Sequence, residues 1–385
     1  MDTGITHIST TIDKAASYLR VVTKHGEAVM MLGLPGIGKT QVATQFARAI
    51  GAEIYCIIAA LRDRLDIIGL PYGKDDAALG RVTSYAPDAF FARLSKERNP
   101  NGPKTVVLFD ELPAAPETVM PVLYRLFQER VAGELTLSDN VILVAAGNPA
   151  SALSACRDLQ PVFRRRFVWL NLVSTLDVWR KWADANGVDG RVLAFLCNPS
   201  FASHFQNFDP KARHLLTYAT PDSWTKLARA LPDILAGFDS NGDRNAIFAG
   251  YVGQAAGTAF SGFLEYGREL GDPRDVLQAP KSAKLPSKQD ALWLLIGGVL
   301  NLCEEDSKFV RPALQLAERL FADRIFADFA AFLVRSMAGR PTIQPAMLKS
   351  TELSDLARIL QTEHKEVMRA LEAVNLDLAT QARAA

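Results

Sequence analysis

The sequence predicts an α/β fold in which a parallel sheet flanked by helices is followed by an α-helical lid and an α-helical C-terminal extension. Three observations support this prediction. Short apolar runs alternate with helical patterns in the first part of the chain, a glycine-rich loop follows the first of these runs, and the second part shows helical patterns alone. We expect a core over residues 1–172, the lid over 173–240 and the extension over 241–385.

The composition indicates a globular protein with more than one structural unit. Its 385 residues exceed one ordinary core, and 49% of them are hydrophobic while 22% are charged. The net charge of +1 provides no overall attraction to nucleic acid or to an anionic membrane, and no apolar run reaches the roughly 18 residues that span a bilayer. The first residues lack a signal-peptide pattern and the four cysteines form no CxxC pair, so we expect a cytoplasmic protein with buried, reduced thiols.

The elements of the core are expected in a regular order. Apolar runs predict buried strands at Ala28–Leu32, Ile54–Ala59, Val106–Phe109 and Val141–Ala146. Helical periodicity predicts helices at 10–25, 41–50, 89–94 and 117–130. Polar, glycine-containing stretches predict exposed hairpins at 74–85 and 129–135, and a cluster of turn residues predicts a turn at 99–103.

A phosphate-binding loop is expected between the first strand and its helix, at Gly33, Leu34, Pro35, Gly36, Ile37, Gly38, Lys39 and Thr40. Glycines allow the backbone to curl so that successive N–H groups point at one anion, and the helix N-terminus adds a positive dipole end. Lys39 would contact the β and γ phosphates, and Thr40 would bind Mg²⁺. An ordinary glycine turn is the alternative, but the strand before and the helix after favour a phosphate site.

Polar side chains follow two other predicted strands. Asp110 and Glu111 follow Val106–Phe109, and Asn148 follows Val141–Ala146 after one glycine. Since ligands bind at the carboxyl ends of strands in open α/β sheets, Asp110 would hold the Mg²⁺ shell and Glu111 would orient or activate the attacking water. Asn148 would hydrogen-bond that water or the γ-phosphate. The alternatives are purely structural carboxylates and a plain Asn-Pro turn.

Three consecutive arginines, Arg164, Arg165 and Arg166, precede the apolar segment 167–170. The planar guanidinium group suits phosphate recognition, including recognition of a phosphate bound to a neighbouring subunit. A solvated basic turn is the alternative interpretation of the three arginines.

Together these motifs resemble the AAA+ ATPases and, within them, the MoxR-like branch. Gly33–Thr40 resembles Walker A, Val106–Glu111 resembles Walker B, and Asn148 resembles the sensor-1 residue. The arginines stand where the family carries its arginine finger, and Arg166 best matches the usual Arg-Phe pair. The resemblance covers residues 10–230.

The resemblance implies a P-loop NTPase core that binds ATP with Mg²⁺ and hydrolyses the nucleotide at a site between subunits. It also implies a homo-oligomeric ring, commonly a hexamer. Such a ring acts as a remodelling chaperone, often with a protein partner that bears a von Willebrand A-type domain. Neither nucleic acid nor a membrane is indicated as a partner.

One stretch departs from the family pattern. Related proteins close the lid with a Pro-Arg sensor-2 pair, whereas here Asp222 follows the proline. Lys226 lies one helical turn later on the same face and would partly replace the missing arginine at the nucleotide. We expect Asp222 to cap the N-terminus of its helix, and we expect the change to affect the coupling of the lid to hydrolysis, not nucleotide binding.

The second part of the chain carries helical patterns and no further chemical motif. In the lid, helices are expected at Leu176–Ala185, Arg191–Leu196 and Trp224–Ala230. In the extension, helices are expected at 246–266, 291–303, 310–337 and 353–379, with a loop at 270–288. We expect the extension to pack on the lid or to recruit a partner.

Three functions remain open at the level of the sequence. The first is a ring ATPase that remodels or activates a protein partner, which the motif order favours. The second is a motor that acts on nucleic acid, against which the mixed charges of Lys74, Asp75, Asp76 and Arg81 on the predicted insertion count. The third is a scaffold that binds ATP and hydrolyses it slowly, which Asp222 would favour.

Overall fold

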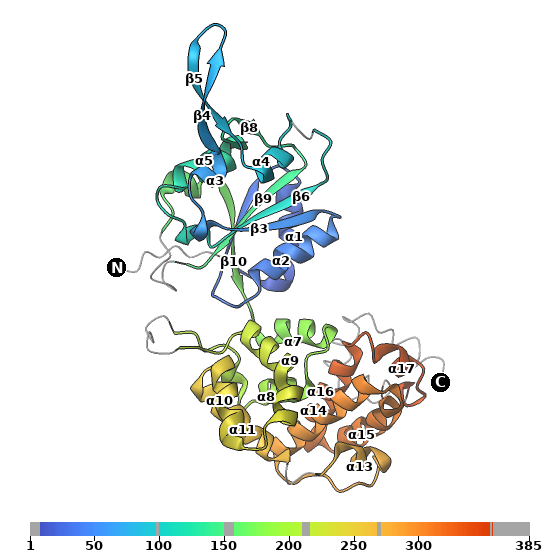
Figure 1. Cartoon of the computed structure of the whole chain (residues 1–385). Helices are drawn as coiled ribbons and strands as arrows, with labels where there is room; N and C mark the ends of the chain where they lie inside the picture. Colours follow the sequence, from blue (N-terminus) through green and yellow to red (C-terminus); the bar gives the residue numbers. More distant parts are fainter. Residues whose placement is uncertain are drawn as a thin grey trace. The chain divides into compact units, whose positions relative to one another are not determined.

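The structure is a computed structural model that describes residues 8–97, 100–149, 158–209, 216–267, 271–354 and 356 (Figure 1). The chain forms two compact units: the first is Met1–Ser174 with Asp209–Lys211, and the second is Thr175–Phe208 with Ala212–Ala385. The predicted lid and extension both contribute to the second unit, and their separation into two domains stays a prediction.

The first unit is built on a six-stranded sheet in the spatial order β1-β10-β2-β9-β6-β3. Every strand pair in this sheet is parallel, which confirms the predicted α/β class. The order places β9 and β10, from the end of the unit, on either side of β2, the strand that precedes the phosphate loop. The strands are β1 Ser9–Thr11, β2 Ala28–Leu32, β3 Glu53–Ile58, β6 Thr105–Asp110, β9 Val141–Gly147 and β10 Phe167–Val173.

Helices cover both faces of the sheet, because successive side chains of each strand point to opposite sides. On one face, Val29 and Met31 pack with α1 and α2 in one hydrophobic cluster. On the other face, Met30, Val107 and Phe109 pack with α3, α4, α5 and α6 in a second cluster. The helices are α1 Ile12–Thr23, α2 Lys39–Ala49, α3 Leu65–Ile68, α4 Ala89–Leu94, α5 Met120–Glu129 and α6 Pro161–Arg164, with 3₁₀ turns η1 Ala59–Leu61 and η2 Leu112–Ala114.

Two hairpins complete the first unit. The strands β4 (Leu70–Asp76) and β5 (Gly80–Ala86) form a two-stranded antiparallel ribbon that projects from the rest of the unit (Figure 1). The strands β7 (Val131–Ala132) and β8 (Leu135–Thr136) form a shorter hairpin. Both predicted hairpins are confirmed, and the first begins earlier than expected because the residues from Leu70 onward also pair with β5.

The helix α5 is shorter than predicted, since it begins at Met120 and not at residue 117. Pro121 lies in its first turn, where the missing backbone N–H costs no helical hydrogen bond. The residues before it form turns, in which Val119 donates its N–H to the carbonyl of Pro116 at 3.0 Å.

The second unit contains helices and no strand in its described residues, and one hydrophobic cluster runs through it. Trp224 of α9, Phe260 of α11 and Phe332 of α16 belong to this cluster, so residues of the predicted lid and extension share one core. The helices α8 and α14 pack against each other where Gly190 and Gly297 bring the two backbones together. The helices are α7 Leu176–Ala185, α8 Gly190–Cys197, α9 Pro221–Gly237, α10 Asn241–Val252, α11 Gln254–Glu265, α13 Pro273–Gln278, α14 Gln289–Glu305, α15 Val310–Ala322, α16 Ala327–Ala338 and α17 Gln344–Leu348, with 3₁₀ turns η3 Ala202–His204, η4 Ser307–Phe309 and η5 Arg324–Phe326.

Two segments that were predicted as single helices are each divided in two. The segment 246–266 is divided because Gly253, at a φ of 87°, ends α10 in a conformation that glycine adopts readily. The segment 310–337 is divided at Asp323, whose backbone is extended and whose side chain accepts a hydrogen bond from the N–H of Ile325.

Two further helices differ from prediction. The predicted loop 270–288 contains α13, which Asp272 caps by accepting from the N–H of Arg274 at 2.9 Å. The helix α9 begins at Pro221 and continues through Pro232, whereas the sequence predicted it only over 224–230. Most of the predicted helix 353–379 lies outside the described residues, as does Asn99 of the predicted turn.

The cysteines only partly follow prediction. Burial raises the pKa of Cys197 and of Cys303 to about 12, which suits unreactive thiols. Cys56 is exposed, so the expectation that it is buried is wrong, and Cys156 lies outside the described residues. Among the described helices, none has both the length and the apolar character to cross a membrane.

Candidate active site

The loop between β2 and α2 has the backbone geometry of an anion site. Gly36 and Gly38 have φ angles of 71° and 102°, a left-handed conformation that glycine adopts without a Cβ penalty. Gly38 directly precedes α2, and the first backbone N–H groups of a helix lack acceptors inside it. A phosphate at this end of α2 would accept from these groups at the positive end of the helix dipole.

The other predicted loop residues contribute in different ways. The N–H of Gly33 donates to the carbonyl of Gly147 at 3.3 Å, which links the loop to β9. Pro35 has no N–H to donate. The side chain of Ile37 is 5% exposed in the cluster with α1 and α2, so a contribution of Ile37 to phosphate binding would come from its backbone.

Lys39 lies at the centre of the loop and is held by oxygen atoms. Its Nζ donates to the carbonyls of Gly33 at 2.8 Å and Leu34 at 3.0 Å, and to Asn148 Oδ1 at 2.8 Å. Lys39 and Asn148 are each 8% exposed. The structure therefore brings together two predicted site residues that are far apart in sequence.

The contact with Lys39 determines how the amide of Asn148 is oriented. An ammonium group only donates hydrogen bonds, so the oxygen of the amide must face Lys39. The Nδ2 group then points elsewhere, and within the described residues it makes no hydrogen bond. It is a donor of the kind that a phosphate oxygen or a water molecule would accept.

Thr40 and Asp110 bring together oxygen atoms of the kind that bind Mg²⁺. Thr40 Oγ1 donates to Asp110 Oδ2 at 2.9 Å, across seventy residues of sequence. The donor set fits Mg²⁺, because this ion prefers oxygen ligands, takes few from the protein and keeps several water molecules. A hydroxyl and a carboxylate within hydrogen-bond distance of each other can both contact one such ion.

Glu111 occupies an unusual backbone conformation directly after Asp110. Its φ of 54° and ψ of 34° lie in the left-handed region, which few residues other than glycine adopt. Its N–H donates to Asp110 Oδ1 at 2.9 Å, and its side chain is exposed. No hydrogen bond or ion pair engages this carboxylate within the described part of the chain.

Cys56 lies near Asp110 and was not recognised from the sequence. Partial burial raises the pKa of its thiol, and the negative charge of Asp110 raises it further. The proximity arises because β3 pairs with β6 in the sheet. No local sequence signal indicates such a pairing.

The three arginines have different surroundings. Arg164 donates from Nε to the carbonyl of Leu159, and its guanidinium lies 3.7 Å from Asp158. Arg166 donates to the hydroxyl of Tyr124 at 3.0 Å and lies over the ring of that residue, 5.5 Å from its centroid. Arg165 is exposed and makes no side-chain hydrogen bond or ion pair within the described residues.

The arginines and the phosphate loop lie at opposite ends of the sheet. Arg166 precedes β10, whose first residue Phe167 is aligned with Ala28 at the start of β2. The phosphate loop follows Leu32, the last residue of β2. Since the strands are parallel, about 16 Å of strand separate the two levels. Phe163 and Phe167, which flank the arginines, also pack in the cluster on the sheet face opposite α2.

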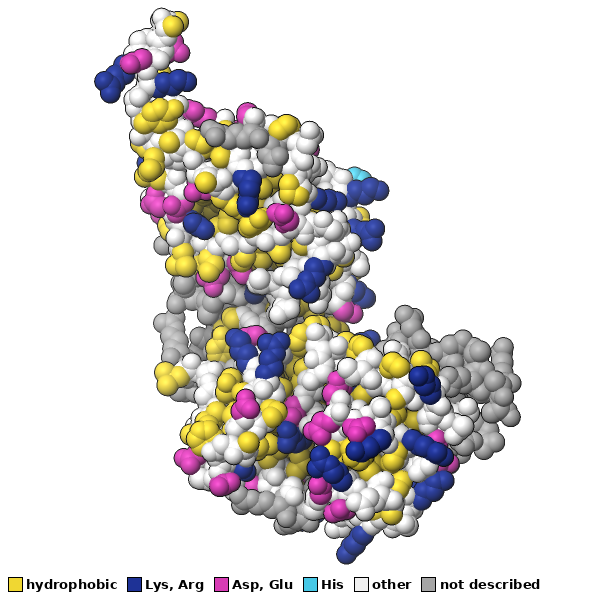
Figure 2. Space-filling model, turned by 45° about the vertical axis from the view of Figure 1, so that its right-hand side comes forward, with side chains coloured by type: hydrophobic (Ala, Val, Ile, Leu, Met, Phe, Trp, Pro, Cys, Tyr) yellow, Lys and Arg dark blue, Asp and Glu magenta, His cyan; other side chains and the backbone are white. Residues whose placement is uncertain are grey.

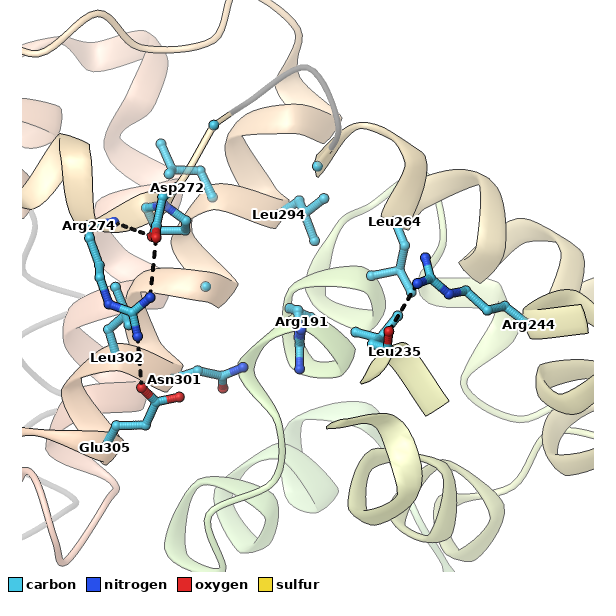
Figure 3. Close-up of a pocket in the computed structure, with 15 residues that line it drawn as sticks. Arg191, Leu235, Arg244, Leu264, Asp272, Arg274, Leu294, Asn301, Leu302 and Glu305 are labelled. Carbon is cyan, nitrogen blue, oxygen red and sulfur yellow. Dashed lines mark hydrogen bonds and ion pairs between the residues drawn. The ribbon is translucent and has the colours of Figure 1, made fainter. Parts of the chain in front are cut away.

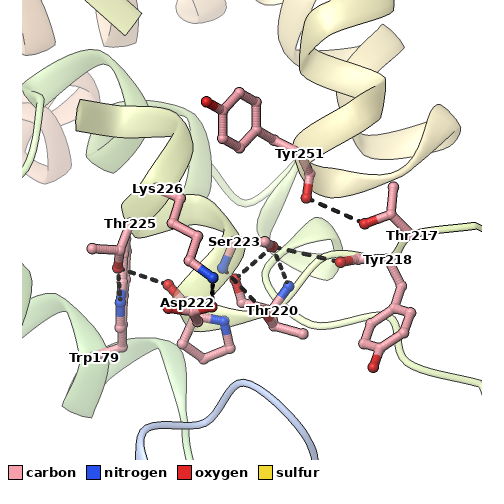
Figure 4. Close-up of polar contacts among 10 residues, drawn as sticks. Trp179, Thr217, Tyr218, Thr220, Asp222, Ser223, Thr225, Lys226 and Tyr251 are labelled. Atoms are coloured by element: carbon pink, nitrogen blue, oxygen red, sulfur yellow. Dashed lines mark hydrogen bonds and ion pairs between the residues drawn. The ribbon is translucent and has the colours of Figure 1, made fainter. Parts of the chain in front are cut away.

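Lys226 and Asp222 form an ion pair in the second unit, with 2.6 Å between Nζ and Oδ2 (Figure 4). The expectation that Asp222 caps its helix is wrong. Thr220 is the cap: its side chain accepts from the N–H of Ser223, and Ser223 Oγ accepts from the N–H of Thr220. Asp222 lies in the first turn, where a negative charge is favourable, and the role of Lys226 at the nucleotide stays a prediction.

The second unit also has a cavity of about 320 Å³, lined by leucines and charged residues (Figure 3). Each of the three arginines at this cavity has an oxygen partner: Arg191 pairs with Asp189, Arg274 with Asp272 and Glu305, and Arg244 with the backbone carbonyls of Leu235 and Phe238. Because two of these charges are paired with carboxylates and the guanidinium of Arg244 donates to backbone carbonyls, the cavity gives no indication of an anionic ligand.

A family model matches part of the first unit. Residues 28–167 match the family model described as the AAA domain, dynein-related subfamily, a segment that includes the phosphate loop, Asp110, Asn148 and the arginines. This match supports the AAA+ ATPase part of the resemblance and does not single out the MoxR-like branch. No curated protein matches the chain.

Similar solved structures include two of RuvB from Thermotoga maritima. A RuvB mutant is 15% identical, with 69% of this chain and 74% of that chain covered and a TM-score of 0.37. The RuvB Holliday junction branch migration motor is 14% identical, with 81% and 76% covered and a TM-score of 0.32.

Proposed function

We propose that this protein is a MoxR-like AAA+ ATPase that hydrolyses Mg-ATP in a homo-oligomeric ring, of the hexameric kind common in the family, and thereby remodels or activates a protein partner. The AAA domain match supports the ATPase activity. The order of motifs supports the MoxR-like branch, since Asp110-Glu111, α5, the β7–β8 hairpin, Asn148 and the arginines follow one another as in that group. The von Willebrand A-type partner and the cytoplasmic location rest on the sequence alone.

ATP would bind with its β and γ phosphates at the N-terminus of α2. Lys39 would exchange contacts with loop carbonyls for contacts with phosphate oxygens, which are stronger acceptors because they carry full charge. Thr40 and Asp110 would hold Mg²⁺, which when bound neutralises charge on the phosphate oxygens. The two residues already lie within hydrogen-bond distance of each other, which supports this assignment.

During hydrolysis, Glu111 would contact the attacking water, and Asn148 would contact that water or the γ-phosphate. Glu111 would orient the water and accept its proton, while the water oxygen bonds to the γ-phosphorus and the bond from that phosphorus to the β–γ bridging oxygen breaks. The exposed carboxylate of Glu111, free of side-chain partners in the described residues, supports this role. Asn148 would donate from Nδ2 to the water or to the γ-phosphate.

The observation that carries the oligomeric proposal is the separation of the arginines from the phosphate loop. They lie at the amino ends of the strands, while the loop follows the carboxyl end of β2. An arginine there lies about the length of a strand from the phosphate loop of its own subunit, so it would act on a nucleotide bound to a neighbour. Arginine supplied in this way stabilises charge on the transferred phosphoryl group.

The projecting β4–β5 ribbon supports a protein partner over nucleic acid. Leu70, Tyr72 and Leu79 are 62%, 46% and 78% exposed. Basic and acidic side chains lie beside them, as Figure 2 shows at the tip of the ribbon. A surface that follows a phosphate backbone needs clustered positive charge, which this ribbon lacks.

A second candidate is a scaffold that binds ATP, assembles and hydrolyses slowly. The ion pair between Lys226 and Asp222 favours it, because the pair neutralises the cation that was expected to replace the sensor-2 arginine. The two candidates differ in the use of Glu111. A scaffold would bind ATP through Lys39, yet its slow turnover would be unchanged in Glu111→Gln.

Mixing of inactive subunits tests the proposed function. Lys39→Ala should abolish ATP binding, and the double variant Arg165→Ala/Arg166→Ala should bind ATP and not hydrolyse it. Mixed rings would contain interfaces in which an intact phosphate loop faces intact arginines, so ATPase activity should partly return. No recovery in rings shown to exchange subunits would contradict the role of the arginines across the interface, and unchanged ATP binding by Lys39→Ala would contradict the nucleotide site.

A further inference from the structure

The three arginines differ in their contacts, and these contacts indicate a different role for each. We propose that Arg165 is the residue that reaches the neighbour's nucleotide, that Arg166 is a brace within its own subunit, and that Tyr124 of α5 is a positioning residue that holds this brace. The inference rests on the proposed function. It differs from the family resemblance, which matches Arg166 to the finger.

Arg164 is excluded from the finger role by its contacts. Its Nε donates to the carbonyl of Leu159, and its guanidinium lies 3.7 Å from Asp158. Its own carbonyl accepts from the indole N–H of Trp169 at 2.8 Å. Arg164 therefore joins the segment before α6 to the strand after it, and its release would disrupt this turn.

Arg166 is held against α5 by two kinds of contact. Its guanidinium donates to the hydroxyl of Tyr124 at 3.0 Å and lies over the ring, 5.5 Å from the centroid. Its Nε is buried and has no acceptor within the described residues, so this side of the group packs against protein. To reach a neighbouring subunit, Arg166 would have to give up the hydrogen bond and the ring contact together.

Tyr124 is half-buried and packs against the core of the first unit. Its ring lies 6.0 Å from that of Phe163, a residue of α6 that is 3% exposed. Leu123 and Leu126, on either side of it in α5, are fully buried. The hydroxyl that receives Arg166 therefore has a defined position relative to the sheet.

Arg165 is the arginine left to reach outward. It is exposed, and within the described residues its side chain has no hydrogen bond or ion pair. It directly follows α6, and both of its neighbours are anchored, Arg164 on Leu159 and Arg166 on Tyr124. These anchors restrict the backbone at Arg165 while its guanidinium stays free to bind phosphate, which its fork of donors suits.

Mixed rings can isolate the finger from the nucleotide site. Acceptor subunits carry Arg165→Ala/Arg166→Ala and keep an intact phosphate loop, while donor subunits carry Lys39→Ala and keep their arginines. All recovered ATPase activity then depends on the donor's arginines. Adding Arg165→Ala to the donor should lower the recovered kcat by about 10³-fold or more.

Variants of the brace should have a smaller effect. Adding Arg166→Ala or Tyr124→Phe to the donor should lower kcat by roughly 10-fold, the factor expected when one hydrogen bond to a charged group is lost. The KM for ATP should not change, because the acceptor binds the nucleotide. Tyr55→Phe is the matched control: Arg93 lies 4.7 Å from the centroid of its ring, its hydroxyl hydrogen-bonds Glu53, and its loss should leave activity unchanged.

One further mixed-ring experiment distinguishes a positioning role of Tyr124 from general damage to the fold. Tyr124→Phe placed in the acceptor should leave the recovered activity unchanged, whereas a structural defect would lower it in both positions. The assignment is overturned if Arg166→Ala in the donor costs as much as Arg165→Ala, or if Arg165→Ala costs nothing. No recovery with the unmodified donor, in rings that exchange subunits, would instead overturn the proposed function on which the inference rests.

Discussion

Two adjacent carboxylates at the end of β6 have separate surroundings. Asp110 accepts from the N–H of Glu111 with one oxygen and from the hydroxyl of Thr40 with the other, both at 2.9 Å. Glu111 is exposed, and its left-handed backbone turns the chain immediately after Asp110. Such a conformation costs roughly 1–3 kcal/mol and persists where the surroundings fix it. We attribute metal binding to the fixed carboxylate and contact with water to the exposed one.

Glu111→Gln should therefore separate hydrolysis from binding. The amide keeps the size of the side chain and removes the proton acceptor, so turnover should fall by roughly 10²- to 10⁴-fold. ATP affinity, measured by calorimetry, should stay near the wild-type value because Lys39 and Thr40 are unchanged. Glu53→Gln, at an exposed carboxylate that begins β3, is the control and should hydrolyse ATP normally. Full turnover by Glu111→Gln would remove Glu111 from the mechanism.

A buried carboxylate in the second unit should make stability depend on pH. Asp184 is 3% exposed, and burial raises its pKa from 3.8 to about 6, although the positive charges of Arg180 and Arg340 act in the opposite direction. The folded protein then holds this proton more tightly than the unfolded chain does. Its contribution to stability is complete below about pH 4 and is lost as pH rises through 6.

Asp184→Asn should remove this dependence. Relative to the variant, the free energy of unfolding of the wild type should fall by up to about 3 kcal/mol between pH 4 and pH 7, and then stay level. The attraction of Arg180 acts only on the ionised carboxylate, so it is already included in the raised pKa of Asp184. Denaturant unfolding across this range measures the difference, and a constant value would show that Asp184 does not titrate as expected.

The predicted site residues that lie close together in the structure are those that follow the carboxyl end of a strand. Lys39, Asp110 and Asn148 follow apolar runs, and parallel pairing brings the ends of those runs to one edge of the sheet. The partners of Arg166 and Asp222 were not predictable in this way. Tyr124 contacts Arg166 only because α5 and α6 pack together. The helix α9 is capped by Thr220 and not by Asp222, because Ser223 completes a capping box with Thr220.

Strands and helices are predicted best where burial of their side chains is the main determinant of the structure. The strands β2, β6 and β9 read as unbroken apolar runs because both faces of the sheet are covered there. The expectation of a buried strand at Ile54–Ala59 is wrong, because β3 lies at the edge of the sheet and is mostly exposed or half-buried. Helix ends were predicted less well, because single residues decide them through backbone geometry. Gly253 divides one predicted helix, while Pro232 lies inside α9 without ending it.

The contact between α8 and α14 gives a test at the scale of elements. A Cβ added at Gly297 would lie 2.5 Å from the carbonyl oxygen of Gly190 and 3.0 Å from the Cβ of Ala194. Backbone cannot yield as a flexible side chain does, so the two helices must move apart. Gly297→Ala should destabilise the second unit by about 1–3 kcal/mol.

Gly262→Ala is the matched control for this substitution. Gly262 lies within α11, and a Cβ there would meet nothing within 4 Å. Alanine is favoured over glycine in a helix, so this variant should gain up to about 1 kcal/mol. Urea unfolding measures both variants, and a loss of equal size at both positions would argue against close packing of α8 on α14 as the cause.

At the scale of the whole molecule, the proposed activity requires more than one subunit. In the proposed ring, each first unit contributes the phosphate loop at the carboxyl ends of its strands and an exposed arginine at the amino ends. A single copy therefore holds both halves of the catalytic apparatus without joining them. A ring joins each half to the complementary half of the next subunit, which is a heterologous contact that closes on itself.

Specific ATPase activity should consequently fall on dilution. As subunits separate by mass action, each nucleotide site loses the arginine of its neighbour, and the rate per subunit should drop by roughly 10³-fold or more toward that of the Arg165→Ala/Arg166→Ala variant. The double variant is the control, because its residual rate per subunit should not depend on concentration. Activity and molecular mass are measured over the same dilution series, so that the fall in rate can be compared with the loss of oligomer. A rate per subunit that stays constant where the measured mass is that of one chain would show that a single copy is catalytically complete, and the proposed ring would then have no role in hydrolysis.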